Sequence, residues 1–298
     1  MIKKCLGKAI VFWSLFFFSL TSYASPPQPL SPKPIKGIYI TQWNFENTSF
    51  LRSLIGKAKA AKIDTFVVDL EIPSKRYQAN LELLHDNHIK YVARIVMFPD
   101  GGTPAHIKDP AIWQKKYKLV QQAVDWGAQE IQLDYIRYNT KQKPSAQNSH
   151  DIHTIIQWYK AKLAAQKVPL QIDVFGVTSF GESKHIGQNI KLFSQTVDAI
   201  CPMVYPSHYV PFAVHFNKPY NTVFDSLDGI KKQFNNQVPM KVYAYIELSN
   251  YHFRMSQENT MKYISAQLKA VEAAGADGWY AWSPHNRYDN LFKLLQSR

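Results

Sequence analysis

Residues 109–138, DPAIWQKKYKLVQQAVDWGAQEIQLDYIRY, contain one complete helix-and-strand unit. Asp109 is a suitable N-cap residue, Pro110 fits the first helical turn, and Gly127 is typical of a helix end. The run that follows, residues 130–138, is rich in apolar and aromatic residues, which predicts a buried strand. An apolar stripe with helical spacing lies between the two helix signals, at Trp113, Tyr117, Val120 and Val124.

The same unit recurs along the chain from Gly37 onwards. Short apolar runs alternate with amphipathic stretches, and this strict alternation predicts parallel strands joined by right-handed crossovers. The expected strands span residues 37–43, 64–71, 91–98, 130–138, 170–176, 198–206, 241–247 and 277–283. Further helical stripes cover residues 51–58, 152–163, 224–234 and 256–275.

Eight such units in about 260 residues indicate the α/β class and a closed (β/α)8 TIM barrel that forms a single domain over residues 37–298. The alternative is an open doubly wound sheet that binds a nucleotide. No Gly-x-Gly-x-x-Gly follows the first expected strand, and no Walker-type loop is present, which argues against that alternative. A hydrophobic content of 46% excludes a disordered chain.

Residues 1–24 have the pattern of a secretory signal peptide. Three lysines precede an apolar core at residues 9–20, and Ser22-Tyr23-Ala24 fits a small-x-small cleavage site. The alternative is an uncleaved membrane anchor, but the core of about 12 residues is shorter than the roughly 20 that span a bilayer. We therefore expect a periplasmic or secreted protein with no membrane span after signal cleavage.

Residues 25–36, SPPQPLSPKPIK, hold five prolines and predict an extended Pro-rich linker before the barrel. After cleavage of the leader, Cys201 is the only remaining cysteine, which excludes an intramolecular disulfide. Cys201 lies in an apolar run and is interpreted as a buried, inert thiol.

Two carboxylates mark the candidate catalytic site. The active site of this fold lies at the C-terminal ends of the strands, and an ionised carboxylate within an apolar strand is costly unless it is paired or used. Asp134 and Asp173 lie in apolar runs on neighbouring strands, so they can converge at the barrel mouth. Two carboxyl groups that flank one bond are what glycoside hydrolysis needs. The alternative is that both pair with Arg94 or Arg137 and only brace the barrel.

Other polar and aromatic side chains fall at the expected strand ends. Aromatic rings suit the apolar faces of sugars, and Tyr205 and Trp282 are the preferred candidates for sugar contact. Further aromatics of this rim are Trp43, Tyr135, Tyr138, Phe175, Tyr209, Tyr245 and Trp279. The remaining substrate-binding candidates are Asp69, Arg94, Arg137 and His208.

Metal and nucleophile motifs are missing from the sequence. It contains no His-Glu-x-x-His, no His-x-His on a strand and no Gly-x-Ser-x-Gly elbow. We therefore expect neither a metal site nor a cofactor.

Five motifs in this order resemble the putative glycosyl hydrolase domain family, whose members are secreted bacterial barrels distantly similar to α-amylase-type glycosidases. The motifs lie at residues 93–96, 130–138, 173–176, 202–209 and 275–279. The resemblance covers residues 37–295 and implies a barrel that cleaves glycosidic bonds. By analogy it implies that Asp134 is the nucleophile and Asp173 the general acid/base, with Glu247 at the end of the seventh strand in reserve.

The charge of the chain bears on its partners. It carries 35 Lys and Arg against 22 Asp and Glu, a formal net charge of +13, which favours an anionic partner. The basic residues are spread along the chain without a nucleic-acid-binding module, so we expect no such partner. The leading prediction is an exported glycoside hydrolase that cleaves a polysaccharide or envelope glycan with two carboxylates. The alternative is a non-catalytic carbohydrate-binding barrel.

Overall fold

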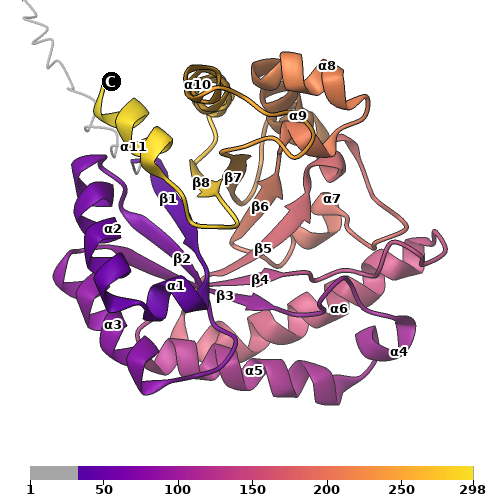
Figure 1. Ribbon diagram of the computed structural model, residues 1–298. Helices are drawn as coiled ribbons and strands as arrows, with labels where there is room; N and C mark the ends of the chain where they lie inside the picture. The colour runs from indigo at the N-terminus through magenta and orange to yellow at the C-terminus, as the bar shows by residue number, and fades with distance from the viewer. Residues whose placement is uncertain (1–32, 298) are drawn as a thin grey trace, which may run out of the picture. The chain divides into compact units, whose positions relative to one another are not determined.

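A closed barrel of eight parallel strands forms the centre of the computed structural model, which describes residues 33–297 (Figure 1). Each strand pairs with its neighbours in the chain, and β1 closes the ring on β8. The predicted (β/α)8 barrel is therefore confirmed. The strands are β1 (Ile35–Ile40), β2 (Thr65–Asp69), β3 (Lys90–Val96), β4 (Glu130–Asp134), β5 (Leu170–Phe175), β6 (Ala199–Met203), β7 (Lys241–Glu247) and β8 (Gly278–Trp282).

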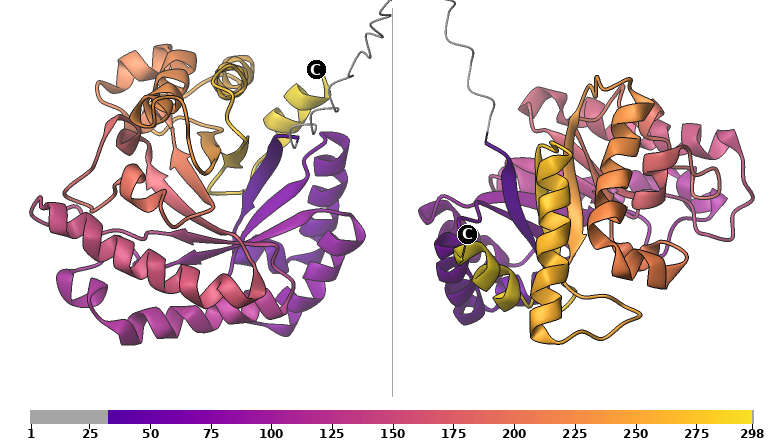
Figure 2. Two further views of the ribbon diagram at one scale, coloured as in Figure 1. Left: turned by 180° about the vertical axis from the view of Figure 1, so that it is seen from behind. Right: turned by 90° about the horizontal axis from the view of Figure 1, so that it is seen from above.

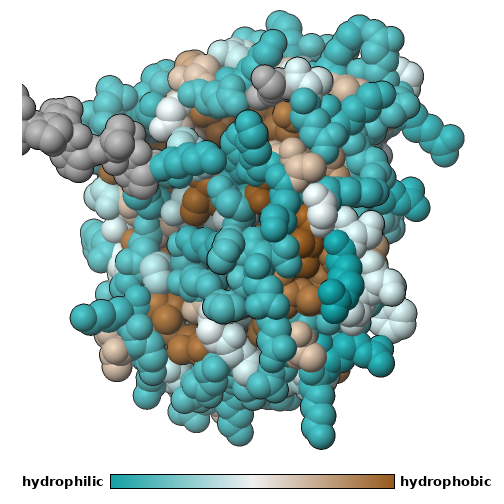
Figure 3. All heavy atoms as spheres, turned by 90° about the vertical axis from the view of Figure 1, so that its left-hand side faces the viewer, coloured by the Kyte–Doolittle hydropathy of each residue, from teal (hydrophilic) through white to brown (hydrophobic). Residues whose placement is uncertain are grey.

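Helices surround the strands on the outside (Figures 1 and 2). The helices are α1 (Gln42–Glu46), α2 (Thr48–Ala60), α3 (Lys75–Asp86), α4 (Pro104–Ile107), α5 (Pro110–Asp125), α6 (Ala146–Leu163), α7 (Ile190–Phe193), α8 (Phe212–Asn217), α9 (Pro219–Gln233), α10 (Gln257–Ala273) and α11 (Asp289–Gln296). Both predicted N-caps are present, because Asp109 accepts a hydrogen bond from the Ala111 amide and Ser256 accepts one from the Asn259 amide. The side that carries α2 and α3 is predominantly hydrophilic, with only small apolar patches (Figure 3).

Side chains fill the barrel interior, as expected for a packed core. Many of them are polar, and they satisfy one another in a buried network. The Tyr245 hydroxyl donates to Oε1 of Gln132 at 2.9 Å, and Nε2 of Gln132 donates to Oε1 of Gln171 at 3.1 Å. Cys201 is fully buried beside these amides, in agreement with the sequence interpretation. This network supports the charged layer above it, at the C-terminal ends of the strands.

Several expected strand bounds are wrong, and local backbone chemistry explains two of them. The first strand begins at Ile35 and ends at Ile40, because Thr41 caps α1 by accepting from the Asn44 amide at 3.3 Å. The fourth strand ends at Asp134, because Tyr135 adopts a left-handed conformation (φ 51°) that turns the chain. The sixth strand ends at Met203 rather than at residue 206.

The predicted leader at residues 1–24 and most of the predicted linker lie outside the described residues. The expected linker extended to residue 36, whereas Ile35 and Lys36 are part of β1. Within residues 33–297, none of the helices combines the length and the apolar content that crossing a membrane requires.

Two glycines give a matched test of the packing. A Cβ atom at Gly176, directly after β5, would lie 2.0 Å from the Tyr209 hydroxyl and 2.6 Å from the Met203 carbonyl oxygen. A Cβ at Gly56 within α2 meets no atom within 4 Å. We expect Gly176→Ala to lower the free energy of unfolding by about 1–3 kcal/mol. We expect Gly56→Ala to raise it by about 0.5–1 kcal/mol. Urea denaturation measures both, and a stable Gly176→Ala protein would contradict the described packing.

Candidate active site

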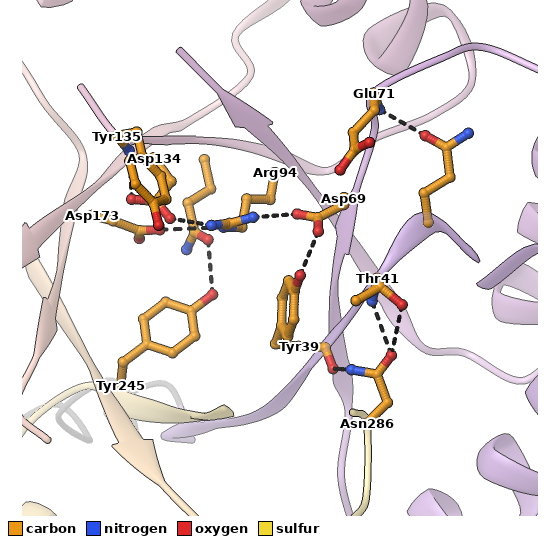
Figure 4. Close-up of polar contacts among 12 residues, drawn as sticks. Tyr39, Thr41, Asp69, Glu71, Arg94, Asp134, Tyr135, Asp173, Tyr245 and Asn286 are labelled. Atoms are coloured by element: carbon orange, nitrogen blue, oxygen red, sulfur yellow. Dashed lines mark hydrogen bonds and ion pairs between the residues drawn. The ribbon is translucent and has the colours of Figure 1, made fainter. Parts of the chain in front are cut away.

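Arg94 on β3 joins three aspartates from three other strands (Figure 4). Its guanidinium group donates to Asp69 at the end of β2 and to Asp134 at the end of β4. Its Nε lies 3.6 Å from Oδ2 of Asp173 on β5. The side chains of all four residues are at most 10% exposed. The structure therefore builds one buried cluster of charge from residues that are far apart in the sequence.

Tyr39 completes this cluster on the β1 side. Its hydroxyl donates to Oδ2 of Asp69 at 2.5 Å, and the Arg94 guanidinium lies 5.2 Å from the centre of its ring. Burial, and the charge of Asp69 next, raise the pKa of Tyr39 far above its ordinary value, so the hydroxyl keeps its proton. Asp69 is thus engaged by Tyr39 and Arg94 on both of its oxygens.

Asp173 is the most deeply buried acid of the cluster. Its burial, and then the negative charge of Asp134, raise the pKa of Asp173 well above the ordinary aspartate value. A hydrogen bond between the two carboxyl groups acts in the same direction. Its Oδ1 atom has no hydrogen-bond partner among residues 33–297. Burial and the neighbouring Asp134 carboxylate therefore both favour the protonated form of Asp173.

A cavity of about 210 Å³ opens above the cluster, at the C-terminal ends of β3 to β8. Arg94 and Asp134 contribute its charged floor, whereas Asp173 lies beneath them and does not line it. The cavity is lined by Arg94, Asp134, Tyr135, Arg137, Phe175, Met203, Tyr205, His208, Tyr251 and Trp282. Asp134 is therefore the one carboxyl group that a molecule in the cavity can reach directly.

Arg137 holds one aromatic wall of the cavity in place. Its guanidinium lies 5.0 Å from the ring centres of both Tyr135 and Phe175, a cation–π geometry. The same group donates to the carbonyl oxygens of Asp100 at 3.3 Å and Tyr138 at 3.0 Å. These contacts fix the orientation of Arg137 beside the cavity.

The opposite wall is a stack of rings. Trp282 stacks on Tyr205 with ring centres 5.7 Å apart, and Tyr251 stacks on His208 at the same separation. Burial, and then the neighbouring His252, lower the pKa of His208, so its imidazole is neutral at pH 7. This wall presents flat faces and hydroxyl groups to the cavity and carries no charge.

Glu247 lies outside the cavity lining. Its Oε1 accepts from the Ser207 amide at 3.0 Å and from the Tyr263 hydroxyl at 2.5 Å, and its Oε2 accepts from the Ser207 hydroxyl. His252 contacts the Ser207 carbonyl oxygen at 3.0 Å. Ser207 lies between Tyr205 and His208 in sequence, so Glu247 fixes the loop that carries both of these cavity residues.

We expect Glu247→Ala to lower the free energy of unfolding by about 2–4 kcal/mol, because it leaves buried donors of Ser207 and Tyr263 without an acceptor. Glu247→Gln keeps one accepting oxygen, so we expect a cost of about 1 kcal/mol. Neither variant should lower kcat/KM more than about tenfold, since Glu247 acts through the loop. Urea denaturation and steady-state kinetics test this, and a loss of 10³-fold in Glu247→Gln would instead make Glu247 catalytic.

The same residue gives a pH dependence of known sign. Burial raises the pKa of Glu247 from 4.5 to about 7. Protonated Glu247 therefore contributes to the free energy of unfolding, and this contribution is fully present below the pKa that Glu247 has in the unfolded chain. The contribution is lost as the pH rises through the folded pKa of about 7. Between pH 5 and 8, the free energy of unfolding should therefore fall more in the wild-type protein than in Glu247→Gln.

The structure brings six of the nine sequence-predicted residues to one cavity, and three lie beside it. Arg94, Asp134, Arg137, Tyr205, His208 and Trp282 line the cavity, whereas Asp69, Asp173 and Glu247 are buried around it. Sequence reasoning missed Tyr39 and Tyr251. A tyrosine inside a strand has the pattern of a core residue, and the loop of Tyr251 has no periodic pattern at all.

The side chains of the charged cluster show whether it is arranged to bind a metal ion. Within the described part of the chain, no three or more His, Cys, Asp and Glu side chains are grouped so as to hold a metal ion. The three aspartates of the cluster instead share the guanidinium group of Arg94. In chemical terms, Asp173 and Asp134 can exchange a proton, and the Asp134 carboxylate can stabilise a positive charge on a molecule in the cavity.

Solved structures with the same fold include several carbohydrate-active proteins. An endo-β-1,4-mannanase from Thermotoga petrophila superposes with a TM-score of 0.64 at 11% identity, covering 90% of this chain and 76% of the mannanase. The C-terminal domain of a putative chitinase from Desulfitobacterium hafniense gives 0.63 at 15% identity, covering 89% and 99%. The Bacillus megaterium spore cortex-lytic enzyme SleL gives 0.61 at 10% identity, covering 91% and 75%. At these identities the similarity shows the fold.

The sequence itself identifies the family. No curated protein sequence matches the chain. Residues 103–288 match the family described as putative glycosyl hydrolase domain. This region runs from the loop after β3 to the loop after β8 and includes Asp134 and Asp173. The chain therefore belongs to the putative glycosyl hydrolase domain family.

Proposed function

We propose that this protein is a glycoside hydrolase that cleaves a polysaccharide or cell-envelope glycan with the carboxyl groups of Asp134 and Asp173 and without a metal. The observation that carries the proposal is the contact between these two groups. Asp134 lies on the floor of an aromatic-walled cavity, and Asp173, whose protonated form burial favours, lies behind it. Family membership supports the same reaction class.

The charge of the cluster suits the transition state of glycoside hydrolysis. With Asp173 protonated, the charges of Asp69 and Asp134 exceed the single positive charge of Arg94 by one. The sugar develops positive charge at its anomeric carbon as the bond breaks. A fixed negative charge in a site shielded from water stabilises this charge without reorganisation. Asp134 is the group placed to supply it.

The proposed reaction assigns one step to each acid. The Asp134 carboxylate attacks the anomeric carbon while the bond to the glycosidic oxygen breaks, and the leaving oxygen takes the proton of Asp173. Water then attacks the same carbon while the bond to Asp134 breaks, and the Asp173 carboxylate takes a proton from this water. In the free protein the two carboxyl groups lie within hydrogen-bonding distance of each other. The two carboxyl groups of retaining enzymes are about 5–5.5 Å apart, which is a larger separation. Asp173 does not line the cavity in the free protein. The proposed step therefore requires that a bound sugar separates the two carboxyl groups and brings Asp173 within reach of the leaving oxygen.

The aromatic walls support a carbohydrate as the occupant of the cavity. Trp282, Tyr205 and Tyr251 present ring faces that match the apolar face of a sugar. The Arg94 guanidinium and the His208 imidazole provide polar contacts on the floor and the wall. A cavity of about 210 Å³ is small, so it holds a single sugar ring of a longer chain.

The direct test is product formation by the wild-type protein on a panel of polysaccharides and peptidoglycan, followed by chromatography and mass spectrometry of the released sugars. We expect new reducing ends from at least one substrate. The competing function is a non-catalytic carbohydrate-binding barrel, which is favoured by the burial of Asp173 beneath the cavity. Sugar binding without products at any pH would support that barrel and contradict the hydrolase.

We also propose export of the protein to the periplasm or the medium. The support is the sequence of residues 1–24, followed by the proline-rich segment before the barrel. Mass spectrometry of the protein from its native cells should find a mature N-terminus at Ser25. An intact Met1 terminus would contradict cleavage.

A further inference from the structure

Helix α1 places an unusually exposed tryptophan at the rim of the barrel. Trp43 is 83% exposed, more than any other large hydrophobic residue among residues 33–297. Its helix directly follows β1, so it lies at the same end of the barrel as the cavity. A tryptophan with this exposure leaves most of its apolar surface in water, which is unfavourable, and it contributes almost nothing to the core. Its indole is therefore available to a ligand at this end of the barrel.

Fixed contacts hold α1 in place on both sides. On one side, Oδ1 of Asn286 accepts from the Thr41 amide at 3.0 Å (Figure 4). The same oxygen accepts from Nδ2 of Asn44 at 2.9 Å. On the other, Oε1 of Gln42 accepts from the Glu71 amide at 2.7 Å and also from the next amide in the chain. The indole of Trp43 is thus carried by an anchored helix, which lowers the entropy that a ligand must overcome.

A hollow of about 370 Å³ lies beside Trp43 and contains an unpaired cation. Arg76, at the first turn of α3, lines this hollow, and its guanidinium group forms no hydrogen bond or ion pair with any residue from 33 to 297. The one carboxylate in the lining is Glu46, whose Oε1 accepts from Nε2 of Gln42 at 2.7 Å and from the Ser74 hydroxyl at 2.9 Å. A guanidinium group without a partner among residues 33–297 therefore lines the same hollow as the indole of Trp43.

We propose that Trp43 and Arg76 form a distal subsite that binds an acidic sugar residue of a polysaccharide, such as a uronic acid. The inference rests on the proposed hydrolase function and extends it to the substrate class. The indole stacks on the sugar face, and the guanidinium binds the sugar carboxylate with two parallel hydrogen bonds. Without Lys3, Lys4 and Lys8 of the proposed leader, the chain keeps a net charge of 13 − 3 = +10, which attracts an acidic glycan over the whole surface.

The rim connects this subsite to the cavity. Trp282 in the cavity wall stacks on Tyr39 of β1, with ring centres 6.3 Å apart. Nδ2 of Asn286 donates to the Tyr39 carbonyl oxygen at 3.1 Å, and Asn286 also holds α1. These buried contacts join the cavity wall to α1, and the proposed path takes a polysaccharide with one ring in the cavity past Trp282 toward Trp43. The subsite would contact sugar units beyond the one that is cleaved.

The experiment compares acidic polysaccharides with their carboxyl-reduced forms. Affinity electrophoresis or calorimetry is done with alginate, polygalacturonate and hyaluronan in Asp134→Asn protein, so that hydrolysis does not consume the ligand. We expect at least one acidic polymer to bind at least tenfold more tightly than its reduced form. Arg76→Ala should remove this difference, whereas Trp43→Ala should weaken both forms at least fivefold.

Two surface variants are the controls. Lys115→Ala removes an exposed positive charge on α5, and Tyr220→Ala removes a partly exposed ring on α9. The inference is wrong if no acidic polymer is preferred over its reduced form, or if Arg76→Ala changes binding no more than Lys115→Ala. Loss of binding in Tyr220→Ala equal to that in Trp43→Ala would also overturn it. Failure of the hydrolase proposal is a separate result, namely wild-type protein that releases no product.

Discussion

Asp134→Asn is expected to lower kcat/KM by at least about 10³-fold, which corresponds to a loss of about 4 kcal/mol of transition-state stabilisation. Asp134 is the only carboxyl group in the cavity lining, and the amide replaces its charge without changing its size. Steady-state assays on the substrate found in the polysaccharide panel measure the loss. Asp86→Asn is the matched control, because this exposed acid at the end of α3 should leave kcat/KM unchanged.

The same variant should remain folded. The amide oxygen of residue 134 can still accept from the Tyr135 amide, which Asp134 does at 2.5 Å. Loss of the negative charge also removes one of the causes that raise the pKa of Asp173, so Asp173 can ionise and pair with Arg94. We expect a change in Tm of only a few degrees. Retained activity in a folded Asp134→Asn protein would contradict the assigned role.

Arg94→Met is expected to lower the free energy of unfolding at pH 7 by about 3–5 kcal/mol, the usual cost of leaving buried charges without a partner. The substitution removes the one cation that contacts Asp69, Asp134 and Asp173. Arg94→Lys keeps a positive charge but cannot bond to three carboxyl groups, so we expect an intermediate loss. Urea denaturation measures each variant.

The loss in Arg94→Met should depend on pH. Buried carboxyl groups without a counterion have folded pKa values above their unfolded values, so they favour the folded state only at low pH. That contribution is lost as the pH rises through the folded pKa. The difference from wild type should therefore grow between pH 5 and 8. Equal stability of Arg94→Met and wild type at pH 7 would show that Arg94 does not balance buried negative charge on Asp69, Asp134 and Asp173.

The sequence was sufficient to predict the fold and to bring Asp134 and Asp173 to the same part of the barrel. Alternation of apolar runs and helical stripes predicted the barrel, and Asp134 and Asp173 were found because each interrupts an apolar strand. The position of Glu247 at a strand end was also predicted. Its side chain nevertheless binds Ser207 and Tyr263. Which partner a strand-end carboxyl meets depends on tertiary contacts that no local pattern encodes.

Other parts of the site could not be predicted from local sequence patterns. Helix α1 has five residues, too few for a periodic stripe, so the sequence predicted a strand through Trp43. The joining of three acids by Arg94 depends on the register of β2, β3 and β4, in which Asp69 pairs with Arg94 and Val96 with Asp134. The sequence left open whether Arg94 braces the acids or binds substrate, and its position in the cavity floor allows both.

The most direct measurement is the infrared carbonyl band of protonated carboxyl groups at pH 7. Spectra of Glu247→Gln protein are compared with those of the Glu247→Gln, Asp173→Asn double variant, because Glu247 titrates near this pH. We predict a band from a buried, protonated carboxyl group in the first protein that is missing from the second. If the carbonyl band of protonated carboxyl groups is the same in the two folded proteins at pH 7, Asp173 is ionised. The proton that the proposed reaction delivers to the leaving oxygen would then not exist.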